Sequence, residues 1–561
     1  MKKIHFIMNL IRDSYIITQK TCFSRKTGPF SLSPAAYVMY NHPYVWKREG
    51  NIMSGTTICI LVSIAVYLIG MLYIGFFYSR GNTSSGDFYL AGRKLGTVVT
   101  AMSTEASDMS AYLLMGVPGL AFFCGVAEAS WTAIGLAVGT YLNWLFVAKR
   151  LRLYSAKLNA ITVPDFISLR FHDGSKLLES IGALLVIVFF VPYTASAFVA
   201  CGKLFNSMFG VAYLPAMLVS AFVIVAYTSS GGFMAASVTS LIQGLVMTFA
   251  LIVVLIFGVN AAGGWAQVIA SAREIPGYLS LFAGTSIQSS SSGSYGAIAI
   301  ISTLAWGLGY FGMPHVLIHF MAVKSETMLK TSRRIATVWV VISLAVAVVI
   351  GIVGYAMAKA GVVEMFSSSA AAESLIVRSA AAMSTQGWFF AIIAGLILAG
   401  ILAATMSTAD AQLLAAASGV THNLLSDVFG IELSDKMNLL IARLAVIIIA
   451  AIAVFFALDP NSSIFRVVSF AWAGFGATFG PVMLFALFWK RCNRWGALAG
   501  MLSGGAVVFL WKYLVRPLGG AWDIYELLPA FIVACAAIVA VSLLTKAPDR
   551  ETVEEFESVK A

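Results

Sequence analysis

The sequence is poor in charge. Only 11% of its 561 residues are Asp, Glu, Lys or Arg, whereas 60% are hydrophobic, and the mean hydropathy is +0.88. A soluble domain carries about a quarter charged residues, which keep its surface wet. So few charges exclude a water-soluble globular protein of this size, and they indicate a chain that faces lipid.

Motifs for metal, phosphate or covalent chemistry are also missing. No HExxH, GxSxG or P-loop pattern occurs, and the six cysteines form no CxxC pair. His315 and His319 are four residues apart, but they lack the third ligand or the glutamate of a metal site, so we interpret them as a solvated or structural pair. The sequence therefore predicts no enzymatic activity.

The basic residues do not form one patch. The net charge is +11, but Lys and Arg sit in short runs between apolar segments, as membrane topology requires, so no nucleic-acid partner is expected. Three loops hold most of these runs: Lys149, Arg150, Arg152 and Lys157; Lys324, Lys330, Arg333 and Arg334; Lys490, Arg491 and Arg494.

Long apolar runs are abundant instead. A membrane-spanning helix needs roughly 20 mostly apolar residues. The chain contains thirteen such runs, which predict an all-α integral membrane protein with 13 transmembrane helices: 55–77, 97–121, 125–148, 177–204, 211–229, 236–258, 295–320, 335–359, 386–414, 437–457, 464–489, 495–514 and 525–544.

An odd number of spans puts the two termini on opposite sides of the membrane. The three basic loops share one side if the chain starts outside, so we expect an outer N-terminus and a cytoplasmic tail, 546–561, in the cell inner membrane. Residues 1–52 conflict with this topology because they carry eight Lys and Arg. We interpret them as a basic extension before a true start at Met53, with a genuine disordered or amphipathic leader as the alternative. The membrane-embedded body would then be 53–545.

The second span is interrupted by polar residues. Ser103, Ser107 and Ser110 recur on one face, and Glu105 and Asp108 stand beside them. A carboxylate at bilayer depth costs several kcal/mol, on the order of 3 or more, so it must face the bundle interior and meet a cation, a proton or donors. This span therefore predicts a functional site.

The seventh span is interrupted by glycine and proline. It reads Trp-Gly-Leu-Gly-Tyr-Phe-Gly-Met-Pro-His over 306–315. The second and seventh spans are five apart, which is the spacing of two inverted five-helix repeats (spans 2–6 and 7–11) that each open with a discontinuous helix. Freed backbone groups at that depth must line a cavity or bind something, so the pair indicates a transporter.

The ninth span adds oxygen atoms. Ser407, Thr408 and Asp410 follow one another closely, and Ser407 and Asp410 share a helical face. Hard cations such as Na⁺ prefer several oxygen ligands. Hydroxyls of this helix and carbonyls of an unwound one would make such a site.

These segments also resemble a known family, the sodium:solute symporters, from about Met53 to the last span. The resemblance rests on the following residues: Arg93, Ala-Ser-Asp-Met-Ser (106–110), Met-Gly-Val-Pro-Gly (115–119), Val-Pro-Asp-Phe (163–166), Trp-Gly-Leu-Gly-Tyr (306–310), Met-Ser-Thr (406–408), Ala-Trp-Ala-Gly-Phe-Gly (471–476) and Gly-Pro (480–481). It implies the leucine-transporter-type five-plus-five inverted repeat and sodium-driven import of proline or a closely related small amino acid.

The resemblance also implies site residues. The main Na⁺ site would use backbone carbonyls of Ala106, Met109 and Ala404 with the hydroxyls of Ser407 and Thr408. Asp108 matches the family's sodium-critical acid. The positions that enclose the imino acid would be Ser110, Tyr193, Trp306, Tyr310 and Pro314, an aromatic pocket that suits a pyrrolidine ring.

The chain departs from the proline-transporting branch at four positions. Glu105 replaces a small residue, and Ala111 replaces a glycine. Ser240 stands where many members have an aspartate, whereas Asp410 stands where that branch has a serine, so we hypothesise that the second carboxylate has moved from the sixth span to the ninth. Glu105, with no basic partner nearby in the sequence, is a candidate for proton coupling or for pairing with a substrate amine.

Three alternatives stay open. The same fold could take a different small solute or use a proton gradient because of Glu105. The chain could also be a transporter-like sensor with a separate partner, since only some sixteen residues follow the last span. An intramembrane enzyme is the weakest of the three because the catalytic motifs are missing.

Overall fold

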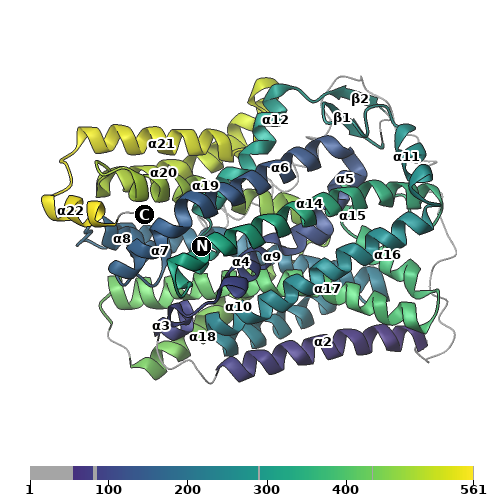
Figure 1. The fold of residues 1–561 in the computed structure, drawn as a ribbon, viewed down its shortest axis with the longest axis horizontal. Coiled ribbons are helices and arrows are strands. Elements are labelled where there is room, and N and C mark those ends of the chain that lie inside the picture. Colours follow the sequence, from purple (N-terminus) through teal and green to yellow (C-terminus); the bar gives the residue numbers. More distant parts are fainter. Residues whose placement is uncertain (1–54, 80–84, 289–290, 432–433, 560–561) are drawn as a thin grey trace, which may run out of the picture.

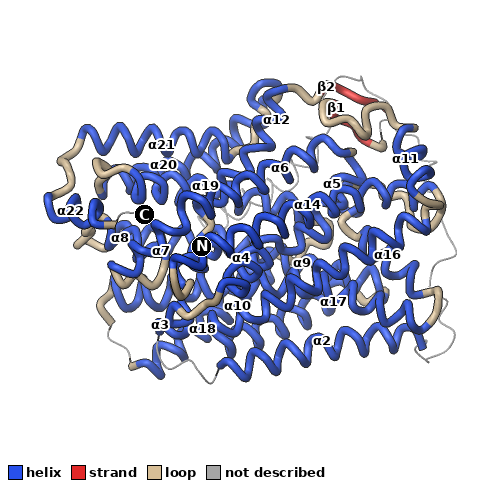
Figure 2. Tube along the Cα trace, in the orientation of Figure 1, coloured by secondary structure: helices blue, strands red, loops and turns tan. Residues whose placement is uncertain are grey.

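The computed structural model describes residues 55–79, 85–288, 291–431 and 434–559. The proposed N-terminal extension, 1–52, and its start at Met53 lie outside the described residues. The described chain is an α-helical bundle with one small hairpin, β1 (Ala283–Ser286) and β2 (Ser291–Ser294), as Figure 2 shows.

The first half of the bundle runs from α2 to α11. Its helices are α2 (Gly55–Ser79), α3 (Ser85–Leu90), α4 (Thr97–Ala111), α5 (Val117–Cys124), α6 (Val126–Leu142), α7 (Ala148–Lys157), α8 (Val163–Arg170), α9 (Leu177–Phe209), α10 (Tyr213–Ala261) and α11 (Trp265–Arg273). Short π-helical turns, η3 (Tyr112–Gly116) and η4 (Asn143–Val147), continue α4 into α5 and α6 into α7.

The second half follows the hairpin (Figure 1). Its helices are α12 (Ala297–Leu304), α13 (Pro314–Ala322), α14 (Leu329–Lys359), α15 (Ser369–Ala372), α16 (Leu375–Ser384), α17 (Trp388–Ser418), α18 (Asp435–Phe456), α19 (Ile464–Phe488), α20 (Arg494–Leu510), α21 (Leu527–Leu544) and α22 (Arg550–Ser558). A 3₁₀ segment, η5 (Ala305–Gly312), joins α12 to α13, and a π-helical segment, η7 (Gly419–Val428), extends α17.

Eleven helices of the described chain are long and apolar enough to cross a membrane, and the bent pair Ala297–Gly312 and Pro314–Ala322 makes a twelfth. The predicted span 211–229 corresponds to a shorter apolar helix, Tyr213–Ala226. It continues into the sixth span through a break at Gly232, where φ is 68°. The multi-span helical fold is confirmed, while the count of thirteen stays a prediction.

Both predicted interruptions are present. α4 changes direction at Ser110, whose φ of 48° and ψ of −168° are not helical. The seventh span is wound as a 3₁₀ helix over η5 and bends by 45° where Met313 is extended before Pro314. Such irregular backbone is tolerated at membrane depth only where protein or a cavity surrounds it, and every residue from Thr100 to Ala111 is buried.

The C-terminal helix α22 lies against α7 and α8 at one end of the bundle (Figure 1). The ring of Phe556 packs against two guanidinium groups, 4.6 Å from that of Arg150 and 4.8 Å from that of Arg170. Arg170 is fully buried and donates to the carbonyl oxygen of Ala486 on α19. The helix therefore covers basic side chains that would otherwise face solvent.

Candidate functional site

The five residues predicted to bind Na⁺ lie where α4 meets α17. Ser407 Oγ donates to the carbonyl oxygens of Ala106 (2.8 Å) and Ala404 (3.2 Å), and Thr408 Oγ1 donates to Ala404 at 3.2 Å. The carbonyl of Met109 borders the break in α4 and accepts from the N–H of Tyr112. All five residues are buried. Carbonyl and hydroxyl oxygens are the ligands that a hard cation prefers, so the donor set fits sodium.

Ser110 forms the break itself. Its side-chain oxygen accepts from the N–H of Tyr112 at 3.1 Å, which caps the next turn. A non-glycine residue at positive φ is strained by roughly 1–3 kcal/mol and persists only where the surroundings hold it. The hydroxyl of Ser110 thus stabilises the break in α4, which lies directly before Ala111.

Asp108 is held by aromatic hydroxyls. Tyr310 donates to its Oδ2 at 2.6 Å, and Tyr193 donates to its backbone carbonyl at 3.2 Å. The closest basic nitrogen among its recorded contacts is His315 Nε2, 3.8 Å from Oδ1. Within the described part of the chain, no Lys or Arg pairs with Asp108. Its charge is therefore not neutralised by a fixed cation.

The sequence left open whether His315 and His319 are a solvated or a structural pair, and the structure shows that they are not solvated. Both side chains are buried, and His319 Nδ1 donates to the carbonyl oxygen of His315 at 2.7 Å. The His315 ring packs edge-on against Phe190 and Tyr193. The physical reason is packing: α13 begins at Pro314, directly after the break, and every residue of this helix is buried.

A small cavity borders the break in α4. Its volume is about 10 Å³, room for about one water molecule, and it is lined by Asp108, Met109, Tyr112, Leu136, Tyr193, Trp306, Val468 and Trp472. Predicted residues Tyr193 and Trp306 line it, whereas Tyr310 contacts Asp108 and Pro314 starts α13. A larger groove between α2, α9 and α10 is almost wholly apolar, so we assign the chemistry to the smaller cavity.

Trp472 is the clearest residue that the sequence prediction missed. Its indole Nε1 donates to the carbonyl oxygen of Trp306 at 2.7 Å, while Asn143 Nδ2 donates to that of Tyr310 at 3.0 Å. These bonds satisfy two carbonyls that the 3₁₀ winding of η5 presents to α19 and η4. A Cβ at Gly309 would overlap the Trp472 indole, so glycine is required there. Trp472 lies within the motif 471–476, which was the available signal.

Asp410 is fully buried on α17, and the hydroxyl of Thr228 on α10 donates to its Oδ1. Ser240, the other half of the predicted relocation, is also buried on α10. A role for Asp410 in sodium binding stays a prediction.

Glu105 is likewise fully buried. Trp144 Nε1 donates to its Oε1 at 2.8 Å, and the Trp144 ring packs on Phe320 with 4.5 Å between centroids. Glu105 therefore contacts η4, whose Trp144 packs against α13.

Arg93 precedes the second span and ties three segments together. Its guanidinium donates to the carbonyls of Met321 (2.8 Å), Ser155 (2.9 Å) and Ala160 (2.6 Å). Burial, together with the positive charge of nearby Arg152, lowers the pKa of Arg93 to about 10. The guanidinium is still protonated at neutral pH and acts as a structural clamp.

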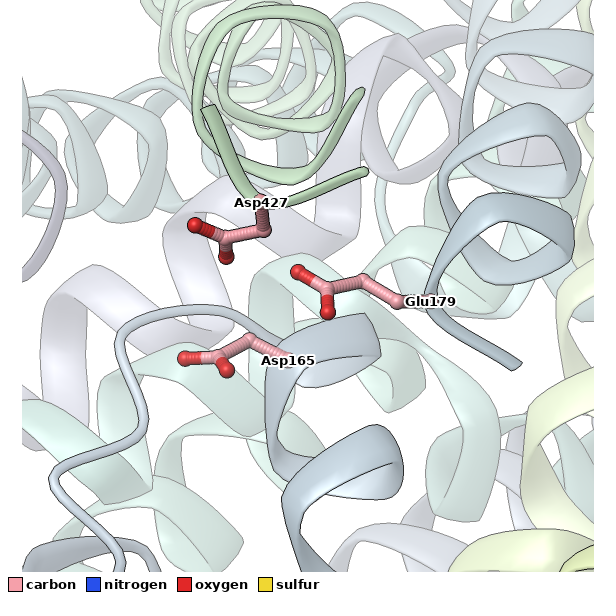
Figure 3. Close-up of side chains that lie close together, drawn as sticks. All are labelled: Asp165, Glu179 and Asp427. Atoms are coloured by element: carbon pink, nitrogen blue, oxygen red, sulfur yellow. The ribbon is translucent and has the colours of Figure 1, made fainter. Parts of the chain in front are cut away.

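A cluster of acids joins α8, α9 and η7 (Figure 3). Ligand oxygens of Asp165, Glu179 and Asp427 lie within 4.8 Å of one another. Lys176 Nζ is 3.1 Å from Glu179, and His422 Nε2 is 3.9 Å from Asp165 and 3.7 Å from Asp427. These two basic groups offset part of the negative charge of the three carboxylates, so we interpret the cluster as an ion-pair network.

The profile of the Sodium:solute symporter family matches residues 88–504. The chain belongs to the sodium:solute symporter family. The resemblance predicted from its motifs is therefore confirmed, and membership in a symporter family agrees with the prediction that the chain is not an enzyme.

Characterised relatives match over most of their length. Osmoregulated proline transporter OpuE of Bacillus subtilis (strain 168) is 41% identical over 500 residues, 89% of this chain and 97% of that protein. High-affinity proline transporter PutP of the same organism is 40% identical over 489 residues, 87% and 98% of the two chains. A sodium/proline symporter of Staphylococcus aureus (strain USA300 / TCH1516) is 39% identical over 495 residues, 87% and 93%.

Solved structures include a Na⁺-coupled sialic acid symporter in a substrate-bound outward-open state. It matches with a TM-score of 0.69 at 17% identity, over 88% of this chain and 99% of that one. Such a likeness shows the fold, which is the leucine-transporter type with discontinuous helices predicted from the sequence.

Proposed function

We propose that this protein is a secondary symporter that uses the sodium gradient to import proline, or a closely related small amino acid, by alternating access. The observation that carries the proposal is the break in α4 at Ser110, four residues after Ala106, whose carbonyl oxygen meets the Ser407 hydroxyl of α17. The names of the relatives, all proline transporters or symporters, support the substrate and the ion.

The small cavity is the proposed substrate site. Its aromatic walls, Tyr193 and Trp306 among them, suit the apolar ring of proline, and Asp108 with the freed backbone at the break suits the charged groups. Ser110, Tyr310 and Pro314 would act by shaping the two broken helices around this cavity.

Sodium would couple to substrate through α4. An ion held by both α4 and α17 stabilises the broken helix in the conformation that accepts substrate, and it shifts that equilibrium only by its differential affinity for the two states. Asp108 and Asp410 are the proposed sodium-linked acids, and the inverted repeats would supply the two alternating states.

We place the protein in the inner membrane with the N-terminus outside and the tail 546–561 inside. The support is the positive charge of the loops around α7, after α13 and after α19. Assignment of spans 2–6 and 7–11 to inverted repeats belongs to the same proposal.

Uptake of labelled proline into proteoliposomes tests the function. We expect uptake to require an inward sodium gradient and to stop when choline replaces sodium. Uptake that follows a pH gradient without sodium would favour proton coupling, and uptake of another solute in preference to proline would correct the substrate. Absence of any uptake would favour a sensor.

A further inference from the structure

The half-helix α4 presents different groups on neighbouring faces. The carbonyl of Ala106 faces Ser407 of α17 and the proposed sodium site, whereas Glu105 and Asp108, which are three residues apart, contact Trp144 of η4, Tyr310 of η5 and His315 of α13. Both carboxylates are buried, with Glu105 0% and Asp108 4% exposed. Two buried acids thus lie on the same face of a broken helix.

Each carboxylate is only half satisfied. Trp144 donates to Glu105 Oε1 and Tyr310 donates to Asp108 Oδ2, and both donors are neutral. The second oxygens, Glu105 Oε2 and Asp108 Oδ1, have no hydrogen-bond partner among the described residues. Burying two like charges without a counter-charge costs several kcal/mol, of order 3 or more, so this face favours a bound cation or a bound proton.

Two further oxygens on the adjoining helix lack donors. Asn143 Nδ2 donates to the carbonyl oxygen of Tyr310, and Asn143 Oδ1 has no partner in the described segments. The Thr140 hydroxyl lies beside the Tyr310 hydroxyl, and its oxygen accepts from no donor there. Asn143 and Thr140 are 0% exposed and three residues apart, so they share a face. The surroundings of Tyr310 are therefore rich in acceptors and poor in donors.

His315 does not remove the imbalance. Its Nε2 is 3.8 Å from Asp108 Oδ1, too far for a hydrogen bond, and neither ring nitrogen has a partner within the described chain. A neutral imidazole would add one more acceptor, and a protonated one would balance only one of the two carboxylates.

The geometry points to a second site, for a monovalent cation, formed by Glu105 and Asp108 with the side-chain oxygens of Thr140 and Asn143. This second site rests on the proposed function and extends it, because the proposed sodium site lies on another side of α4, next to α17. The occupant is either a second sodium ion or the ammonium group of the substrate, because both are monovalent cations that oxygen acceptors bind. Glu105 is the carboxylate of this set that lies outside the substrate and sodium residues predicted from the resemblance.

Glu105→Gln tests the site, because the amide keeps an acceptor for Trp144 and removes the charge. Equilibrium binding of ²²Na⁺ to purified protein gives the number of ions per chain. If sodium is the occupant, we expect that number to fall from about two to about one, with the Hill coefficient for sodium falling likewise. Glu274→Gln, at an exposed pair with Lys359 (2.8 Å), is the matched control and should change neither value.

If the substrate ammonium is the occupant, the number of bound sodium ions stays constant in Glu105→Gln. The affinity for proline should then fall about tenfold, corresponding to about 1.4 kcal/mol. Tetrahydro-2-furoic acid, in which oxygen replaces the ring nitrogen, lacks the ammonium, and its binding should not depend on residue 105. Glu105→Ala, which restores a small side chain, should behave like Glu105→Gln.

The inference is overturned if both variants retain the ion count, the Hill coefficient and the proline affinity of the parent protein. Glu105 would then be a neutral acceptor for Trp144. Failure of the proposed function would look different, because the unaltered protein would show no sodium-dependent proline uptake whatever residue 105 is.

Discussion

Ser407 donates a hydrogen bond of 2.8 Å to the carbonyl oxygen of Ala106, across the contact between α17 and α4. A sodium ion between these helices would take both oxygens as ligands, so the hydroxyl would have to turn its proton away. The ion and this hydrogen bond are therefore mutually exclusive. Because Ala106 precedes the break at Ser110, the choice between them acts directly on the part of α4 that borders the cavity.

We predict that Ser407→Ala and Thr408→Ala each raise the sodium concentration for half-maximal uptake about tenfold. Each removes one ligand hydroxyl, and a loss of about 1.4 kcal/mol is a tenfold change in affinity. Sodium titrations of proline uptake measure the effect. Ser418→Ala is the control, since that hydroxyl donates to Ala415 on the same helix, away from α4. Unaltered sodium dependence in both variants would refute the assigned ligands.

We predict that Asp410→Ser weakens sodium-driven uptake, because it removes the one carboxylate placed near the cation path on α17. If the acid has moved from α10, the double variant Asp410→Ser with Ser240→Asp should recover a substantial part of the activity. Initial rates at several sodium concentrations give the comparison. Intact uptake in the single variant would end the relocation hypothesis.

Gly309→Ala should raise the KM for proline about tenfold or abolish uptake. The new methyl group would overlap Trp472, whose indole holds the carbonyl of Trp306 in the wall of the cavity. Inserting a methylene into a packed core costs roughly 1–3 kcal/mol. Gly296→Ala is the control, because a Cβ there meets open space. Equal kinetics in the two variants would show that η5 tolerates displacement of Trp472.

Glu373→Gln should destabilise the protein. The carboxylate accepts from Lys203 Nζ (2.7 Å), from the Ser463 hydroxyl (2.8 Å) and from the N–H groups of Ile464 and Phe465 (both 3.1 Å), and its side chain is 1% exposed. Removing one partner of a buried ion pair costs about 3 kcal/mol. Thermal unfolding in detergent should show a lower Tm than for Glu274→Gln, whose ion pair is exposed. Equal Tm values would contradict the expectation.

The sequence predicted what depends on local composition. Apolar runs located the spans, and the hydroxyls, acids and glycines located both broken helices, because those residues are costly in lipid. It did not predict Tyr112, Leu136, Val468 and Trp472 as cavity residues, since only the packing of distant spans brings them together. The burial of His315 was missed for the same reason: its surroundings are aromatic rings of α9.

The break at Gly232 falls in the gap between two predicted spans, 211–229 and 236–258, so the sequence located it. By contrast, Ser110 was placed among the substrate residues through the resemblance, and its left-handed backbone could not be foreseen because serine rarely adopts it.

The packing of Phe556 against Arg150 and Arg170 determines which truncations and fusions this protein should tolerate. Arg170 has terminal nitrogens without acceptors in the described chain, and the aromatic ring shields them from water. Deleting the tail from residue 546, or attaching a bulky fusion that displaces α22, would expose the guanidinium group of Arg170, which packs against aromatic rings. Reporter tags are better inserted elsewhere, for example in the exposed turn at Gly430, with this glycine kept because its φ is +65°.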